Sequence, residues 1–164
     1  MTDLVVRRAR PDEYERVGAL TIAAYQTLER DHLEDGYAGQ ILDVAGRAES
    51  TEVLVAVDHD GTIVGACTFV SDPTSPWMEW TNADETELRL LAVDASARGR
   101  GVGQALVEAC IARARALGRP LMLHTTQFMP AASRLYERLG LARLPERDVP
   151  GFEPYEFRAY RFDA

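Results

Sequence analysis

Short apolar runs alternate with amphipathic stretches along the chain and divide it into expected strands and helices. A β-branched run at residues 4–9 precedes Pro11, a residue that suits the first turn of a helix. Apolar positions at helical spacing then continue to about Glu29, and a second, shorter helix is expected over residues 36–49. The inward side of this second helix is expected to carry Ile41, Leu42, Val44 and Ala45.

The middle of the chain is predicted to form β-strands. Residues 52–58 alternate between apolar and polar positions, and the Asp60-Gly61 turn joins them to an apolar run at 63–70, which is typical of a hairpin. After a loop at 72–84, residues 85–93 predict another strand. Its last four residues are all apolar, which indicates burial on both faces of a sheet.

The last third alternates helices and strands. Residues 102–117 predict the clearest helix, and Gly118 with Pro120 ends it. A strand at 121–125, a helix at 130–139 and strands at 142–145 and 155–162 follow. The order predicts an α/β fold: one domain over 1–164, with a mixed, mostly antiparallel sheet flanked by helices and a parallel step across the long helix.

The amino-acid composition excludes several classes of enzyme. Hydrophobic residues make up 46% of the 164 positions and charged residues 27%, as in a globular protein. All eighteen basic residues are Arg, so a Schiff-base enzyme using its own Lys and a P-loop ATPase are excluded. Cys67 and Cys110 form no C-x-x-C motif and are expected to be buried thiols. The three histidines show no metal-ligand spacing, so no metal site is expected.

The net charge of −8 disfavours nucleic acid and anionic membranes as partners and favours a cationic amine. The amino-terminal residues lack the apolar core of a signal peptide, and no apolar run approaches the ~20 residues of a membrane span. We therefore expect a cytoplasmic protein.

A glycine-rich turn between the strand at 85–93 and the helix at 102–117 is the most informative segment. It places Arg98 and Arg100 among three glycines at a helix start, where unpaired N–H groups and the helix dipole favour an anion such as a pyrophosphate. A dinucleotide-binding turn fits less well, because Gln104 stands where its third glycine belongs. A tight turn that uses glycine only for its positive φ stays as an alternative.

The pattern Arg98-x-x-Gly101-x-Gly103 resembles the cofactor motif of the GNAT superfamily of N-acetyltransferases. A second block, residues 132–141 with Tyr136, is similar to the helix-to-strand segment of that superfamily, and the two blocks stand in the expected order. Met129 and Leu141 depart from the pattern, since Asn and Phe are commoner there.

The resemblance implies acetyl-coenzyme A (acetyl-CoA) as the co-substrate. Main-chain groups of the strand at 85–93 would meet the pantetheine arm, and one of its N–H groups could steady the oxyanion. Tyr136 would donate a proton to the departing thiolate, for which a phenol pKa near 10 is suitable; a core aromatic is the alternative. The expected cofactor residues are Leu91, Ala92, Val93, Arg98, Gly99, Arg100, Gly101, Val102, Gly103 and Gln104.

An alkylammonium acceptor needs a base, because its free amine is scarce at pH 7 by roughly 4.6 kcal/mol; for an α-amine the deficit is only about 1 to 1.4 kcal/mol. Glu87 is the candidate base, because it alternates with Arg89 along the strand. The resemblance also implies it, since some members of the superfamily carry a catalytic glutamate on the strand at this distance before the Arg98 position. Glu85 is the substitute, and solvated carboxylates are the alternative reading.

Acceptor specificity is expected in variable segments. Tyr37, Trp77 and Trp80 are the chosen acceptor-binding residues, because aromatic rings beside carboxylates suit a cation. Exposed Trp would equally suit a homodimer contact. Further candidates in the same segments are Asp31, His32, Glu79, Phe152 and Tyr155.

These observations predict an N-acetyltransferase that moves an acetyl group from acetyl-CoA to a primary amine of a small molecule, peptide or protein by direct attack in a ternary complex. A non-catalytic acyl-CoA-binding sensor or interaction module on the same fold is the main alternative. A nicotinamide-dependent oxidoreductase is the weaker one.

Overall fold

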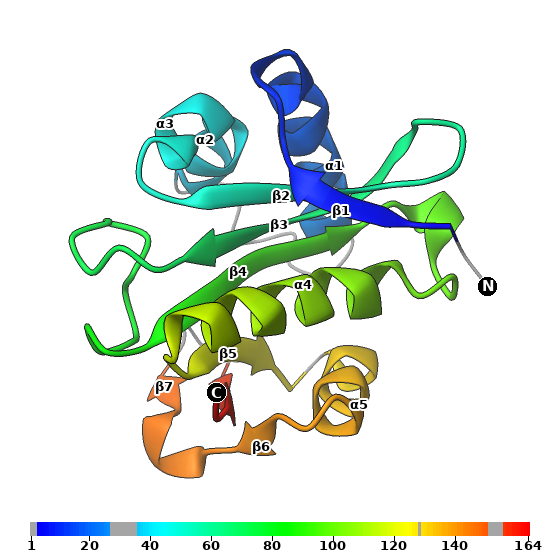
Figure 1. Cartoon of the computed structure of the whole chain (residues 1–164). Helices are drawn as coiled ribbons and strands as arrows, with labels where there is room; N and C mark the ends of the chain where they lie inside the picture. The colour runs from blue at the N-terminus through cyan, green and yellow to red at the C-terminus, as the bar shows by residue number, and fades with distance from the viewer. Residues whose placement is uncertain (1–2, 27–35, 128, 151–155) are drawn as a thin grey trace.

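The computed structural model describes residues 3–26, 36–127, 129–150 and 156–164 (Figure 1). Its strands are β1 (Val5–Arg8), β2 (Glu52–Val57), β3 (Ile63–Val70), β4 (Thr86–Val93), β5 (Leu121–Thr126), β6 (Ala142–Arg143), β7 (Val149–Pro150) and β8 (Glu156–Phe162). Its helices are α1 (Tyr14–Gln26), α2 (Tyr37–Leu42), α3 (Val44–Ala48), α4 (Val102–Leu117) and α5 (Pro130–Arg138).

All eight strands join one sheet in the order β1-β2-β3-β4-β5-β8-β6, with β7 paired to β8. Every pairing is antiparallel except β4 with β5, which α4 connects. The expected fold class, a mixed and mostly antiparallel sheet with one parallel step, is therefore confirmed.

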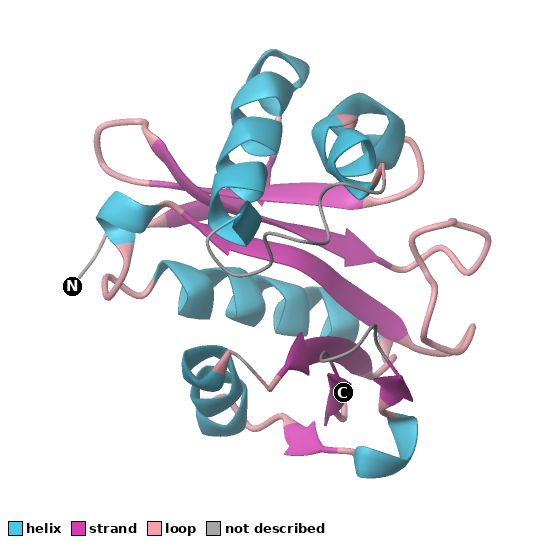
Figure 2. Cartoon of the chain, turned by 180° about the vertical axis from the view of Figure 1, so that it is seen from behind, coloured by secondary structure: helices cyan, strands magenta, loops and turns pink. Residues whose placement is uncertain are grey.

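Helices cover both faces of the sheet (Figures 1 and 2). On one face, α1 and α3 pack on β2, β3 and β4 around Val17, Leu20 and Val44. On the other, α4 buries the stripe that the sequence predicts, Leu106, Val107, Cys110, Ile111 and Ala114, in a core that also takes in Tyr136. The two cysteines are buried thiols as expected, with their sulfur atoms 3.7 Å apart.

The sheet splays between β4 and β5. Their parallel ladder consists of two pairs, Thr86 with Leu121 and Glu87 with Met122. Beyond it, β4 contains a bulge: Thr68 pairs with Arg89 and Ala66 with Ala92, so two residues of β4 oppose one of β3. Leu90, one of these two residues, has a φ of 54°, which is uncommon for a non-glycine residue. The bulge bends β4 away from β5 and opens a groove between them.

Two sequence-based expectations about elements are wrong. The helix expected over 36–49 is two short helices, because the Asp43 side chain caps α3 by accepting a hydrogen bond from the Gly46 N–H at 3.0 Å. The break turns Leu42 and Ala45 outward, while Ile41 and Val44 are buried. The strand expected at 142–145 is shorter, since Pro145 starts a 3₁₀ turn that leads into β7.

Other expectations fall on residues that the structure does not describe: the end of the first helix near Glu29, and the candidates Asp31, His32, Phe152 and Tyr155. Within the described residues, no helix is long and apolar enough to cross a membrane.

Close packing of α4 on β3 provides a test of the fold. A Cβ on Gly65 would lie 2.5 Å from Val102 Cγ1 and 3.1 Å from the Ala92 carbonyl oxygen. We expect Gly65→Ala to lower the free energy of unfolding by about 1–3 kcal/mol in urea denaturation. Gly39→Ala is the control, because Gly39 lies in α2 with no atom within 4 Å of a new Cβ, and it should be neutral or stabilising. Equal stability of the two variants would contradict this packing.

Candidate active site

The glycine-rich turn presents backbone donors at the start of α4. Gly101 is the N-cap with a φ of 80°, and no side chain caps the helix. The helical ladder begins with the Ala105 N–H, which donates to the Gly101 carbonyl at 3.0 Å. The N–H groups of Val102, Gly103 and Gln104 precede it in the first turn, where no intrahelical acceptor exists. Together with exposed Arg98, this terminus fits an anionic group such as the pyrophosphate of acetyl-CoA.

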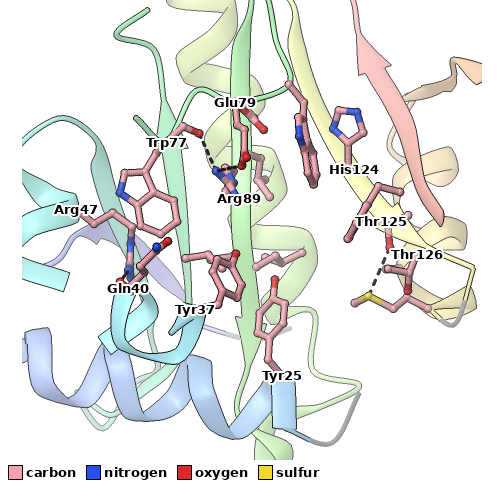
Figure 3. A pocket seen from close by; sticks show the side chains of 18 of the residues that line it. Tyr25, Tyr37, Gln40, Arg47, Trp77, Glu79, Arg89, His124, Thr125 and Thr126 are labelled. Atoms are coloured by element: carbon pink, nitrogen blue, oxygen red, sulfur yellow. Dashed lines mark hydrogen bonds and ion pairs between the residues drawn. The ribbon is translucent and has the colours of Figure 1, made fainter. Parts of the chain in front are cut away.

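The splay between β4 and β5 fits the rest of such a cofactor. Leu90 and Leu91 of β4 line one side of the groove. Thr125 and Thr126 of β5 line the other (Figure 3). Thr126 Oγ1 is buried and has no hydrogen-bond partner among the described residues. A buried hydroxyl without a partner is costly, so a polar ligand group in the groove would satisfy it.

The groove continues into a cavity of about 830 Å³. Its walls come from α1, α2, α3, α5, the loop before β4, and strands β4, β5 and β8 (Figure 3). Tyr37, Trp77 and Trp80, the three residues expected to bind the acceptor, all line it. Glu87 and Tyr136 line it as well, so the structure brings the expected acid, base and acceptor residues to one cavity.

Glu87 is a buried carboxyl group on the cavity wall, with 1% of its surface exposed. Burial raises its pKa to about 7, and the opposing effects of the Arg89 charge and of a hydrogen bond from Thr81 Oγ1 at 3.2 Å are smaller. A carboxyl group that titrates near neutral pH is suited to accept and release protons under physiological conditions.

Glu85 is also buried, but it lies outside the cavity lining and is neutralised by cations. Arg147 reaches its carboxylate at 2.8 Å and Arg161 at 3.2 Å. Burial raises the pKa of Glu85, but the hydrogen bonds from Arg147 and the Asn82 N–H outweigh it and hold the pKa below its usual value. The structure therefore distinguishes Glu87, the candidate base, from Glu85, its substitute in the sequence analysis, by their surroundings.

Tyr136 lines the cavity, belongs to the core under α4 and is 4% exposed. Its ring packs against that of Tyr160 with centroids 5.8 Å apart. Burial raises the pKa of its phenol well above the usual value. The value near 10 used in the sequence analysis is that of a solvated phenol, and burial displaces the pKa of Tyr136 upward from it.

Several residues of the cavity escaped the sequence analysis. Arg47 is buried in its wall, and the Arg89 guanidinium lies beside the indoles of Trp77 and Trp80. A signal for Arg47 did exist, because it continues the buried helical spacing of Ile41 and Val44. His124 donates from Nε2 to the Arg147 carbonyl at 3.2 Å, and burial lowers its pKa.

A grouping of possible metal ligands among the described residues, Asp58, His59 and Asp60, lies at the hairpin turn after β2 and outside the cavity lining.

Comparison of the sequence with known protein families identifies the family of this chain. The sequence model of the Acetyltransferase (GNAT) family matches residues 9–141, which include the glycine-rich turn, β4 and Tyr136. The chain belongs to the GNAT acetyltransferase family. It is therefore an acyltransferase, and the expected resemblance is confirmed.

Relatives of this GNAT acetyltransferase include the 5-NmdU N-acetyltransferase of Pseudomonas phage PaMx11, which is 27% identical over 137 residues, 84% of this chain and 86% of the phage protein. Similar solved structures include an acetyltransferase from Corynebacterium glutamicum related to histone acetyltransferase HPA2 (TM-score 0.76, 23% identity, 100% and 98% of the two chains). Another is yncA of Salmonella typhimurium with its cofactor acetyl-CoA (TM-score 0.70, 18% identity, 99% and 94%).

The raised pKa of Glu87 predicts how stability depends on pH in this GNAT acetyltransferase. The folded state holds the proton up to about pH 7 and the unfolded state only to about 4.5, so stability falls as pH rises through this window. Glu87→Gln removes the charge, and we expect its stability relative to the wild type to increase by roughly 2–3 kcal/mol between pH 4.5 and 7.5 in urea denaturation.

Glu49→Gln, at an exposed position after α3, is the control and should show no such trend. A constant stability difference between Glu87→Gln and the wild type across this pH range would show that Glu87 is not held protonated.

Proposed function

We propose that this acetyltransferase moves an acetyl group from acetyl-CoA to a primary amine by direct attack in a ternary complex. The observation that carries the proposal is a buried carboxyl group with a pKa of about 7, Glu87, in a cavity that opens into the β4–β5 splay. The acetyl-CoA in the similar yncA structure supports this choice of donor.

The chain would hold acetyl-CoA mainly through its backbone. N–H groups of the turn at residues 98–104 bind the pyrophosphate, apart from that of Arg100, which donates to the Ala97 carbonyl at 3.3 Å. The side chains of Arg98 and Arg100 contribute positive charge. Main-chain groups of Leu91, Ala92 and Val93, on the edge of β4 that faces the splay, bind the pantetheine arm. When bound, acetyl-CoA supplies a thioester carbonyl that is activated toward amines. A β4 N–H near the bulge stabilises the negative charge that develops on its oxygen.

Glu87 acts as the base. With a pKa of about 7, about half of its population is ionised at neutral pH and can take a proton from the acceptor ammonium, directly or through a water. Its burial excludes bulk water, which strengthens its interaction with a positive charge in the cavity.

Tyr136 acts on the leaving sulfur. Because burial raises its pKa above the usual value, the phenol stays protonated at neutral pH and is available as a donor. A thiol of pKa near 8.5 is a much stronger acid than this phenol, so hydrogen bonding to the developing thiolate contributes more than complete proton transfer.

The acceptor is a primary amine of a small molecule or a peptide. The name of the phage relative supports including 5-NmdU among the amines to be assayed. A homodimer, expected as one use of Trp77 and Trp80, remains a prediction; both side chains are half-buried in the cavity wall.

Calorimetry with acetyl-CoA tests the first part of the proposal. Gly101→Glu places a carboxylate at the α4 N-cap, and we expect it to weaken binding at least about 10-fold through repulsion of the pyrophosphate. Gly61→Glu is a matched control, because Gly61 has nearly the same positive φ, 81° against 80°, in the hairpin turn. Binding that is lost in both variants, or in neither, would mean that the turn does not hold the cofactor.

Measurements of turnover test the proposed roles of Tyr136 and Glu87. Thioester loss measured with an amine panel should fall about 10- to 100-fold in Tyr136→Phe with little change in acetyl-CoA affinity. In Glu87→Gln the rise of kcat across pH 7 should disappear. If kcat and its pH profile were unchanged in both variants, Tyr136 would have only a packing role. The proton transfer would then be assigned to a group other than Glu87.

A further inference from the structure

Arg47 is a cation buried in the cavity wall. It is 2% exposed and is the largest fully buried side chain of the described residues. Its Nε donates to Thr68 Oγ1 at 3.1 Å, and its Nη1 donates to the carbonyls of Gln40 and Ile41 at 3.3 and 2.9 Å. These partners are neutral. Among the described residues, no carboxylate lies within 4.0 Å of the Arg47 guanidinium.

A second guanidinium shares the same aromatic ring. Arg47 lies 5.3 Å and Arg89 5.0 Å from the centroid of the Trp77 ring (Figure 3). Arg89 also donates from Nη1 to the Trp77 carbonyl at 3.0 Å, and its carboxylate contact is with Glu79 at 3.4 Å, whose side chain is 55% exposed. Trp77 is therefore already in contact with two cations of the protein itself, and it is poorly suited to bind the cationic acceptor that its sequence context suggested.

The two guanidinium groups are suited to bind an anion. Buried charges in proteins are normally paired, and two guanidinium groups around one indole repel each other. Apart from Glu87, the lining contains two carboxylates, and neither is a buried counter-ion for the two arginines. Asp43 is exposed and caps α3, and Glu79 is largely in solvent. A planar carboxylate between Arg47 and Arg89 would accept hydrogen bonds from both, in the geometry that guanidinium groups favour.

The position of Arg89 relative to the base restricts the ligand further. Glu87 and Arg89 are two residues apart on β4, so their Cα atoms are separated by about 6.6 Å and both side chains line the cavity. An ammonium beside Glu87 and a carboxylate beside Arg89 must then belong to one compact molecule.

We propose that the acceptor is a small amino acid-type compound, in which the reacting amine and a free carboxylate belong to the same molecule, and that Arg47 and Arg89 bind the carboxylate. The proposal rests on the proposed acetyl transfer and names its substrate class. It favours a free amino acid over a peptide, because the amino terminus of a peptide has an amide where the amino acid has its carboxylate.

Matched acceptors test the proposal. Each of a set of L-amino acids and ω-amino acids is assayed beside its primary carboxamide and its decarboxylated amine, with acetyl-CoA saturating and thioester loss as the readout. For the fastest acid, we expect kcat/KM to exceed that of its amide by about 10- to 150-fold, the effect of losing a hydrogen-bonded charge.

Variants connect this preference to the two arginines. In Arg89→Gln, which keeps a donor for the Trp77 carbonyl, the preference for acid over amide should fall below about 3-fold. Arg47→Met should have the same effect, but Arg47 also joins α2 to β3, so calorimetry with acetyl-CoA checks that this variant is folded. Arg8→Gln, an exposed strand position paired with Glu52, is the control and should keep the full preference.

The outcomes separate this proposal from the proposed function. Amides or plain amines, 5-NmdU included, that are acetylated as well as the acids would overturn the carboxylate site and leave amine acetylation standing. A preference for acids that persists in Arg89→Gln would equally overturn the assignment to these arginines. Acetyl-CoA binding without transfer to any amine would overturn both.

Discussion

The early end of the parallel ladder between β4 and β5 is the constraint on which the rest of the site depends. After two residue pairs the strands separate, and each is then stabilised from its other side, β4 by β3 and β5 by six pairs with β8. The bulge at Leu90 requires a left-handed backbone that costs a leucine about 1–3 kcal/mol. It persists because Leu90 is buried in packed surroundings, and it leaves main-chain groups of β4 available beside the cavity.

Burial then determines the chemistry of the charged groups around this opening. Glu87 and Arg47 both have pKa values displaced toward neutrality, Glu87 upward to about 7 and Arg47 downward to about 10, for the same reason: each is largely removed from water. Glu85, two residues from Glu87, has the opposite displacement because Arg147 and Arg161 compensate its burial. A cavity with one titrating carboxyl and two guanidinium groups thus forms inside a chain whose net charge is −8.

Sequence reasoning was most successful where the signal is local. The glycine-rich turn, the α4 stripe and the parallel step follow from spacing within one or two elements. Sequence reasoning failed where a property depends on residues that are distant along the chain. Whether Glu85 or Glu87 titrates depends on Arg147 and Arg161, more than sixty residues away. The break at Asp43 depends on one capping bond that competes with helix propensity. Net charge averages over the whole chain, so it does not reveal that Arg47 and Arg89 line the cavity.

The arginines and the base are electrostatically coupled, and this coupling bears on proton transfer. The charge of Arg89 lowers the pKa of Glu87, against the larger effect of burial. A carboxylate bound at Arg89 would offset that charge, so the pKa of Glu87 would rise further. For one proton shared between an acceptor amine and Glu87, each unit of increase favours the neutral amine with protonated Glu87 by about 1.4 kcal/mol. A neutral amine is the form that attacks a thioester. An acceptor that carries its own carboxylate would therefore help to generate its reactive form, and one without it would leave more of its amine protonated.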